Sequence, residues 1–253
     1  MERRGVSLIE LVIASVVLMT VVTLGYMLHL TWIRSYKTTT NLSSARLQVQ
    51  SSVDRIVEDV QETKLSWIWK CAVTGEFTSS EEPDYYALVI WSPRDPDSGT
   101  VVPGTDMGVR VYETIAYVPL KDSDGNVHLH RFRFGANSYP AGVASDYPTA
   151  TIAVSNGNVA LQFVKADSSY GFVSAPSVAE TDGTVVAKNL RKTRFLAPNE
   201  SGNDFDVYDD DGAGGYQAAT YHPTGWVVGL TCRATVETGE KDVEVSTVVM
   251  PRN

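Results

Sequence analysis

The sequence predicts an α+β fold: a long N-terminal helix packed on a mainly antiparallel β-sheet head. No proline lies between Met1 and Glu82, and the apolar residues of this stretch recur at helical spacing. From Trp67 onward, short β-branched and aromatic runs alternate with turn residues instead. The chain has 253 residues, which is enough for one globular domain in addition to the helix.

The chain begins with a short basic leader, which is followed by a long apolar run. Arg3 and Arg4 precede Gly5, and Glu10 is the one formally charged side chain from Val6 to Leu30. The run is long enough to cross a bilayer, which takes about 20 residues. A carboxylate inside such a segment costs about 2.5–3.5 kcal/mol at the helix centre and is usually functional. Residues 6–30 are therefore predicted to span a membrane, and Glu10 is predicted to have a role there.

A second helical pattern follows the apolar run. One face is apolar and the opposite face is charged, and Arg55 can reach Asp59 at i,i+4. The apolar stripe consists of Leu42, Ala45, Val49, Val53, Ile56 and Val60. The pattern predicts one helix from Val6 to about Lys64, roughly 90 Å long at 1.5 Å per residue. Residues 31–66 would form its amphipathic half and pack on the head.

Residues 67–253 are predicted to form the β-rich head. Alternating apolar residues from Trp226 to Val236 predict one strand of a hairpin, with a turn at Thr238–Glu240 and a return strand at Val243–Met250. A connection at residues 121–126 predicts a second hairpin. Polar loops rich in glycine and proline are expected at 92–108 and 136–149. The remaining strands are expected at 85–91, 109–118, 127–134 and 158–164.

Charge and composition exclude several classes of function. The net charge is −9 and the pI is about 4.9, which argues against nucleic acid as a partner. The sequence has no recognisable acid–base pair, nucleophile motif or phosphate loop, so we expect no enzymatic activity. Because Arg3 and Arg4 precede the apolar run, the positive-inside rule predicts a cytoplasmic leader and an extracytoplasmic head after Arg34.

The N-terminal residues resemble those of type IV pilins and of the pseudopilins of type II secretion. Gly5 stands before the expected cut, and Ser7-Leu8-Ile9-Glu10-Leu11 and an unbroken apolar helix follow it. The resemblance implies that residues 1–5 are a leader, that a prepilin peptidase cleaves between Gly5 and Val6, and that Val6 is then N-methylated. Val6 departs from the phenylalanine that is commonest in the family. The alternative is an ordinary signal anchor that contains a glutamate. A secretory signal, however, would have small residues around a cleavage site after the apolar run, where Tyr26–Leu30 lies instead.

The resemblance also gives Glu10 a role in assembly, because it becomes the fifth residue of the mature chain. Cleavage would create an α-amino group on Val6, one helical turn from Glu10. In the bilayer each charge alone is unfavourable, whereas the carboxylate of one subunit could pair with the amine of its neighbour. Glu10 would then fix the axial stagger between subunits.

The C-terminal third resembles the larger minor pilins: the W-type minor pilins of type IV pili and the J-type minor pseudopilins. The matching segments are 185–190, 193–196 and a last strand that ends in Pro251-Arg252-Asn253. The resemblance implies a structural subunit that assembles through its N-terminal helix into a type IV pilus or a type II secretion pseudopilus, with the fibre tip as its expected position. Its partners would be other pilins or pseudopilins and the inner-membrane assembly platform. It would be a single-pass inner-membrane protein before it joins the fibre.

An alternative function belongs to another class. The chain could be a pilin-anchored adhesion or binding module whose head recognises a surface, DNA or a secreted substrate. An exposed aromatic patch or a basic groove on the head would favour it, whereas apolar head surface that meets other pilins would favour the structural subunit.

Two acidic segments suggest a cation site. Asp122–Asn126 has an Asp-x-Asp-Gly pattern, and a second segment carries the candidate ligands Asp204, Asp206, Asp209 and Asp211. Crowded carboxylates suit calcium, although the spacing of an EF-hand and its distal glutamate are absent. Solvated acidic loops are the alternative. His128 and His130 share one strand face, but a zinc site needs further ligands.

Cys71 and Cys232 are the only cysteines. Outside the cytoplasm two cysteines suggest a disulfide. Cys232, however, lies on the expected core face of its strand, where a buried free thiol also fits. The sequence leaves both states open.

Overall fold

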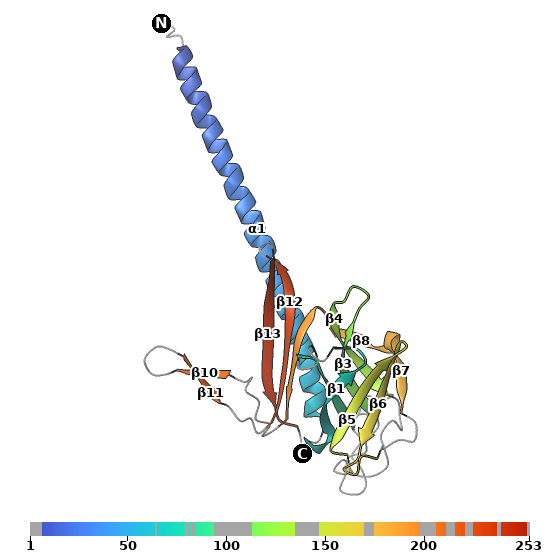
Figure 1. The fold of residues 1–253 in the computed structure, drawn as a ribbon. Coiled ribbons are helices and arrows are strands. Elements are labelled where there is room, and N and C mark those ends of the chain that lie inside the picture. Colours follow the sequence, from blue (N-terminus) through green and yellow to red (C-terminus); the bar gives the residue numbers. More distant parts are fainter. Residues whose placement is uncertain are drawn as a thin grey trace.

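The computed structural model shows a long helix standing beside β-sheets (Figure 1). The helix extends far beyond the head at its N-terminal end. The α+β class and the mainly antiparallel sheets are as predicted. The structure describes residues 7–63, 65–78, 81, 84–93, 113–134, 147–169, 175–197, 206–210, 216–220, 225–236 and 239–251.

Helix α1 (Leu8–Gln61) contains 54 residues and is therefore about 80 Å long. It begins after the N-cap residue Ser7 and ends before the C-cap residue Glu62, close to the predicted bounds. A short 3-10 helix, η1 (Leu65–Trp67), follows it, and a second, η4 (Glu180–Asp182), lies between two strands of the head.

The larger sheet has eight strands in the order β7-β6-β5-β1-β2-β3-β4-β8. Neighbouring strands are antiparallel except β1 and β5, which pair in parallel, with Val73 opposite Ile152. β4 and β6 have the predicted bounds, and the predicted segments 85–91 and 109–118 correspond to β2 and β3 with shifted ends. The strands are β1 (Ile68–Thr74), β2 (Tyr86–Ser92), β3 (Glu113–Lys121), β4 (Val127–Phe134), β5 (Thr149–Ser155), β6 (Asn158–Val164), β7 (Ser177–Ala179) and β8 (Thr184–Ala187).

The smaller sheet has three strands in the order β13-β12-β9. They are β9 (Leu190–Leu196), β12 (Trp226–Val236) and β13 (Gly239–Val249). Val236 pairs with Gly239, so the predicted hairpin is confirmed, but Gly239 and Glu240 belong to β13 and not to the turn. The predicted inward face of β12 is buried, and in the first half of the strand the residues of both faces are buried.

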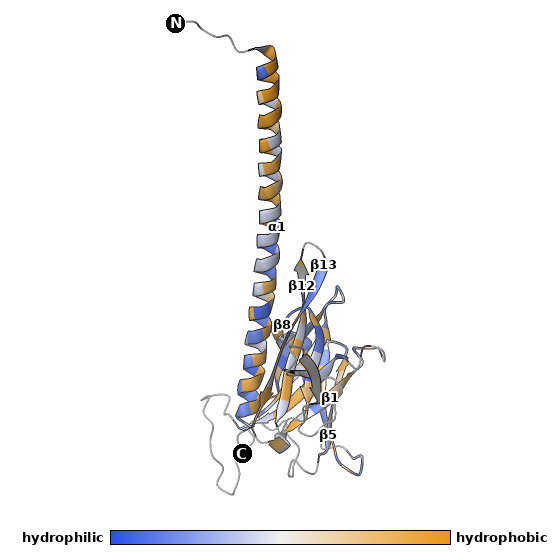
Figure 2. Ribbon diagram, turned by 90° about the vertical axis from the view of Figure 1, so that its left-hand side faces the viewer, coloured by the Kyte–Doolittle hydropathy of each residue, from blue (hydrophilic) through white to orange (hydrophobic). Residues whose placement is uncertain are grey.

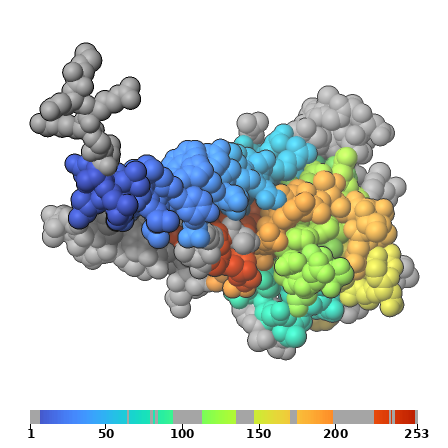
Figure 3. Space-filling view, turned by 90° about the horizontal axis from the view of Figure 1, so that it is seen from above, coloured from blue at the N-terminus to red at the C-terminus, as the bar shows by residue number. Residues whose placement is uncertain are grey.

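The C-terminal half of α1 packs on the head, mainly on β12 and β13 (Figure 2). Val49, Val53, Ile56 and Val60 are fully or almost fully buried, as the apolar stripe predicts. Burial of each such side chain contributes about 1.5–3 kcal/mol to the free energy of folding. Seen from above, the helix lies along one side of the head (Figure 3).

Polar contacts also join the end of α1 and the residues just after it to the larger sheet. The hydroxyl group of Thr63 donates to the carbonyl oxygen of Trp91 over 2.6 Å. Asp59 pairs with Arg131 of β4, so the predicted contact between Arg55 and Asp59 is wrong. Arg55 pairs instead with Glu58, because Asp59 is turned toward the head.

Candidate functional site

The N-terminal half of α1 carries a continuous apolar surface that no described part of the head covers (Figure 2). Among the described residues, α1 is the one helix that is long and apolar enough to cross a membrane. More than half of the side-chain surface is exposed at nearly every large apolar position from Leu8 to Tyr36. An apolar surface of this size marks an interaction with lipid or protein.

Glu10 and Ser7 cap each other at the start of this surface. The Ser7 amide donates to Glu10 Oε2 over 2.9 Å, and the Glu10 amide donates to Ser7 Oγ over 3.2 Å. This is a capping box, in which two otherwise unpaired backbone donors are satisfied. The negative charge in the first turn also interacts favourably with the helix dipole. Glu10 therefore has a local partner at the start of the helix.

The processing residues lie outside the described part of the chain. Gly5 and Val6 precede Ser7, the first described residue, so cleavage between them stays a prediction. Sequence reasoning missed the role of Ser7, although its spacing to Glu10 is the Ser-x-x-Glu pattern of a capping box.

Only part of the candidate calcium segment is described. Asp206 and Asp209 lie in strand β10 (Asp206–Asp210), which pairs with β11 (Tyr216–Thr220); the expectation of a loop is wrong for these two residues. Asp204 and Asp211 lie outside the described residues. Within the described part of the chain, no group of three or more metal-ligating side chains comes together. Calcium binding by these aspartates stays untested.

The Asp122 carboxylate accepts hydrogen bonds from backbone amides of the turn in which it lies. Oδ1 accepts from the amides of Asp124 and Asn126 over 2.9 and 2.8 Å. Desolvation raises the pKa of Asp122, but the hydrogen bonds from Asn126 and Asp124 outweigh it and hold the pKa below its ordinary value. The carboxylate therefore closes the hairpin between β3 and β4.

The two histidines of β4 also have structural contacts. His128 Nε2 lies 3.1 Å from Asp122 Oδ2, and the amide of Asn189 donates to His128 Nδ1 over 3.2 Å. These partners favour the tautomer with the proton on Nε2. His130 stacks on Phe132, and burial lowers its pKa.

Both cysteines are free thiols and are buried. Cys71 lies in β1 of the larger sheet and Cys232 in β12 of the smaller sheet. Burial raises the pKa of each thiol from 9.0 to about 12. Of the two states that the sequence left open, the structure has the thiols and not the disulfide.

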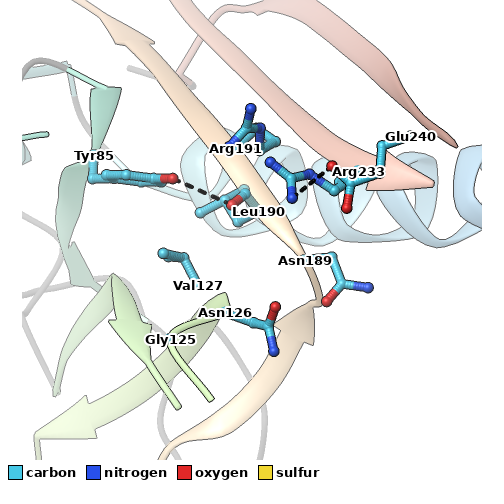
Figure 4. Close-up of a pocket in the computed structure, with 9 residues that line it drawn as sticks. All are labelled: Tyr85, Gly125, Asn126, Val127, Asn189, Leu190, Arg191, Arg233 and Glu240. Carbon is cyan, nitrogen blue, oxygen red and sulfur yellow. Dashed lines mark hydrogen bonds and ion pairs between the residues drawn. The ribbon is translucent and has the colours of Figure 1, made fainter. Parts of the chain in front are cut away.

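A small cavity lies where the chain passes from the larger sheet to the smaller one (Figure 4). Asn189 lies between β8 and β9 and has a φ of 54°. Its backbone carbonyl oxygen accepts a hydrogen bond from the backbone amide of Arg233 over 2.7 Å. The guanidinium of Arg233 pairs with Glu240 over 2.7 Å. The cavity volume is about 140 Å³, whereas ligand pockets usually measure about 300–1,000 Å³. These contacts stabilise the connection between β8 of the larger sheet and β9 of the smaller sheet.

Comparisons with known proteins add no relative. A scan against protein-family models, a search of curated proteins and a search of solved structures each found no match. The features of the chain that point most directly to a function are the exposed half of α1 and the Ser7–Glu10 pair.

Proposed function

We propose that this chain is a minor pilin or pseudopilin, a non-enzymatic subunit that is inserted in the membrane, processed after Gly5 and assembled into a pilus-like fibre. The observation that supports this most is the division of α1 into two halves. The half from Val49 to Val60 is buried on the head, while the half from Leu8 to Tyr36 is exposed and apolar. A soluble subunit would leave this surface in water. In our proposal lipid covers it before assembly and neighbouring helices cover it in the fibre.

The second support is the position of the only acid in the exposed half. Glu10 stands in the first turn of α1, and the next acidic residue is Asp54 in the half that packs on the head. After cleavage, the α-amino group of Val6 would lie one residue before Ser7, next to the capping box. A carboxylate with one local partner retains acceptor sites for the amine of a neighbouring subunit. In our proposal this second contact sets the stagger of the helices.

The test is the N-terminus of the chain in a cell that makes a prepilin peptidase. The intact mass should correspond to a chain that starts at Val6 and carries one methyl group. Gly5→Asp should leave the leader attached. Gly25→Ala is the matched control, because a Cβ at Gly25 meets no atom within 4 Å, so this change should leave processing unaffected. A wild-type chain that keeps residues 1–5, or that is cut elsewhere, would contradict the proposal.

A further inference from the structure

We infer that His29, Trp32 and Tyr36, with Arg34 and Lys37 beside them, form a lipid-interface site that sets the depth of α1 in the bilayer. The inference rests on the proposed membrane insertion and names the partner of α1 at this level. That partner is the head-group and carbonyl region of a phospholipid bilayer that contains anionic lipids.

The three rings form a stacked ladder along α1. The ring centroids of His29 and Trp32 are 6.4 Å apart with an interplanar angle of 21°, and those of Trp32 and Tyr36 are 5.9 Å apart with an angle of 22°. Trp32 is 64% exposed and Tyr36 is 62% exposed. Trp and Tyr have an apolar body and a polar group, and they concentrate where a membrane helix meets water.

The ladder lies about one bilayer-core thickness along the helix from its N-terminal end. The apolar stretch from Leu8 to Leu28 measures about 30 Å at 1.5 Å per residue, which matches the hydrocarbon core of a bilayer. His29 follows this stretch directly, and the Ser7–Glu10 box lies at its other end. A helix that places Leu8–Leu28 in hydrocarbon therefore places the ladder at the interface.

The charge of this segment suits anionic lipid. No Asp or Glu lies between Glu10 and Asp54, whereas Arg34, Lys37 and Arg46 do, in a chain whose net charge is −9. Basic side chains near a bilayer surface attract anionic head groups. Their aliphatic stems can lie along the apolar helix while their charges reach the head groups.

The head leaves the ladder accessible to lipid. The first buried residue of α1 is Val49, about 25 Å along the helix from Trp32. At about 100° per residue, Trp32 and Tyr36 lie about 100° and 140° around the helix from Val49, so the ladder is turned away from the side that packs on the head. The helix between Trp32 and Val49 would thus act as a stalk that holds the head above the membrane.

The test uses the full-length chain in vesicles of phosphatidylcholine and phosphatidylglycerol that carry bromine at different acyl-chain depths. The difference in tryptophan fluorescence between wild type and Trp32→Phe isolates Trp32 from the four tryptophans of the head. We expect bromine close to the head groups to quench this difference most. A depth control places a tryptophan in the middle of the apolar stretch, Val22→Trp in the Trp32→Phe background, where deep bromine should quench most.

Three results would overturn the inference. Strongest quenching of Trp32 by deep bromine would place the ladder inside the hydrocarbon. No quenching of Trp32, with Val22→Trp still quenched, would place the ladder outside the bilayer or under a second copy of this chain. If Val22→Trp is not quenched either, α1 is not inserted, and the proposed membrane anchor fails together with the inference.

Discussion

Arg131 donates from Nε to Oδ2 of Asp59 over 2.9 Å, which joins a strand of the head to the last turn of α1. The hydroxyl group of Tyr117 donates to the same carboxylate oxygen. The Asp59 side chain is 8% exposed and that of Arg131 is 13% exposed. Because one carboxylate meets donors from two strands, this contact fixes the position of the protruding helix relative to the head.

Removal of the Arg131 guanidinium group should destabilise the protein strongly. Arg131→Met leaves the Asp59 charge buried without its partner, which typically costs about 3–5 kcal/mol. The double variant Asp59→Leu/Arg131→Met should recover most of this loss, because no uncompensated charge remains. Denaturant unfolding of the full chain in detergent measures both effects.

A surface pair provides the control for this measurement. Arg55 and Glu58 are each 48% exposed, so Arg55→Met should lower the free energy of unfolding by at most about 1 kcal/mol. Equal losses for Arg131→Met and Arg55→Met would show that the buried pair does not hold the helix on the head.

The free thiols predict a loss of stability at alkaline pH. Burial raises the pKa of Cys71 and Cys232 from 9.0 to about 12, so above pH 9 the unfolded thiols ionise while the folded ones stay protonated. Their contribution to stability is therefore complete below about pH 9 and decreases between about pH 9 and 12. The double variant Cys71→Ala/Cys232→Ala should be less stable than the wild type at pH 8. Its free energy of unfolding should decrease less than that of the wild type as the pH rises from 9 to 12. Equal slopes for the variant and the wild type would contradict free, buried thiols, since a disulfide has no such titration.

Much of the fold could be predicted from local patterns. The helix and strands β4 and β6 have strong periodicity, so their bounds were predicted to within a few residues. The parallel pairing of β1 with β5 was not predictable, because it joins segments that are far apart in sequence. β7 and β8 have only three and four residues, which is too short for a periodic signal.

The candidate site was also predictable only where it depends on residues that are close in sequence. The position of Glu10 in an uncharged run is visible in the sequence. The partner of Asp59 is not, because Arg131 comes next to it only when β4 packs against α1. The local contact at i,i+4 was the simpler expectation, and burial of Asp59 overrides it.

A glycine beside the parallel pair should be intolerant of any side chain. Gly75 has a φ of +88°, and a Cβ there would lie 2.4 Å from the carbonyl oxygen of Val154. Gly125 has a similar φ of +81°, but its Cβ would meet nothing within 4 Å. Gly125→Ala should therefore cost only the backbone strain, about 1–2 kcal/mol. Gly75→Ala should cost about 1–3 kcal/mol more, because the clash is added. Equal melting temperatures for the two variants would disprove the close approach.

In our proposal the charge of Glu10 directs assembly. The capping box provides a matched set of variants, because glutamine also fits the third helical position of such a box. Glu10→Gln therefore keeps the cap but removes the charge, whereas Ser7→Ala keeps the charge but removes the side-chain acceptor. Loss of the cap alone costs about 0.5–2 kcal/mol at the helix start.

The most direct measurement is the amount of this subunit in purified fibres, relative to the amount of processed chain in the membrane. We expect Glu10→Gln to be inserted and cleaved after Gly5 like the wild type but to be depleted from the fibres, whereas Ser7→Ala is incorporated nearly as well as the wild type. Fibres from Glu10→Gln cells that contain as much of the subunit as wild-type fibres would contradict a role of the Glu10 charge in assembly.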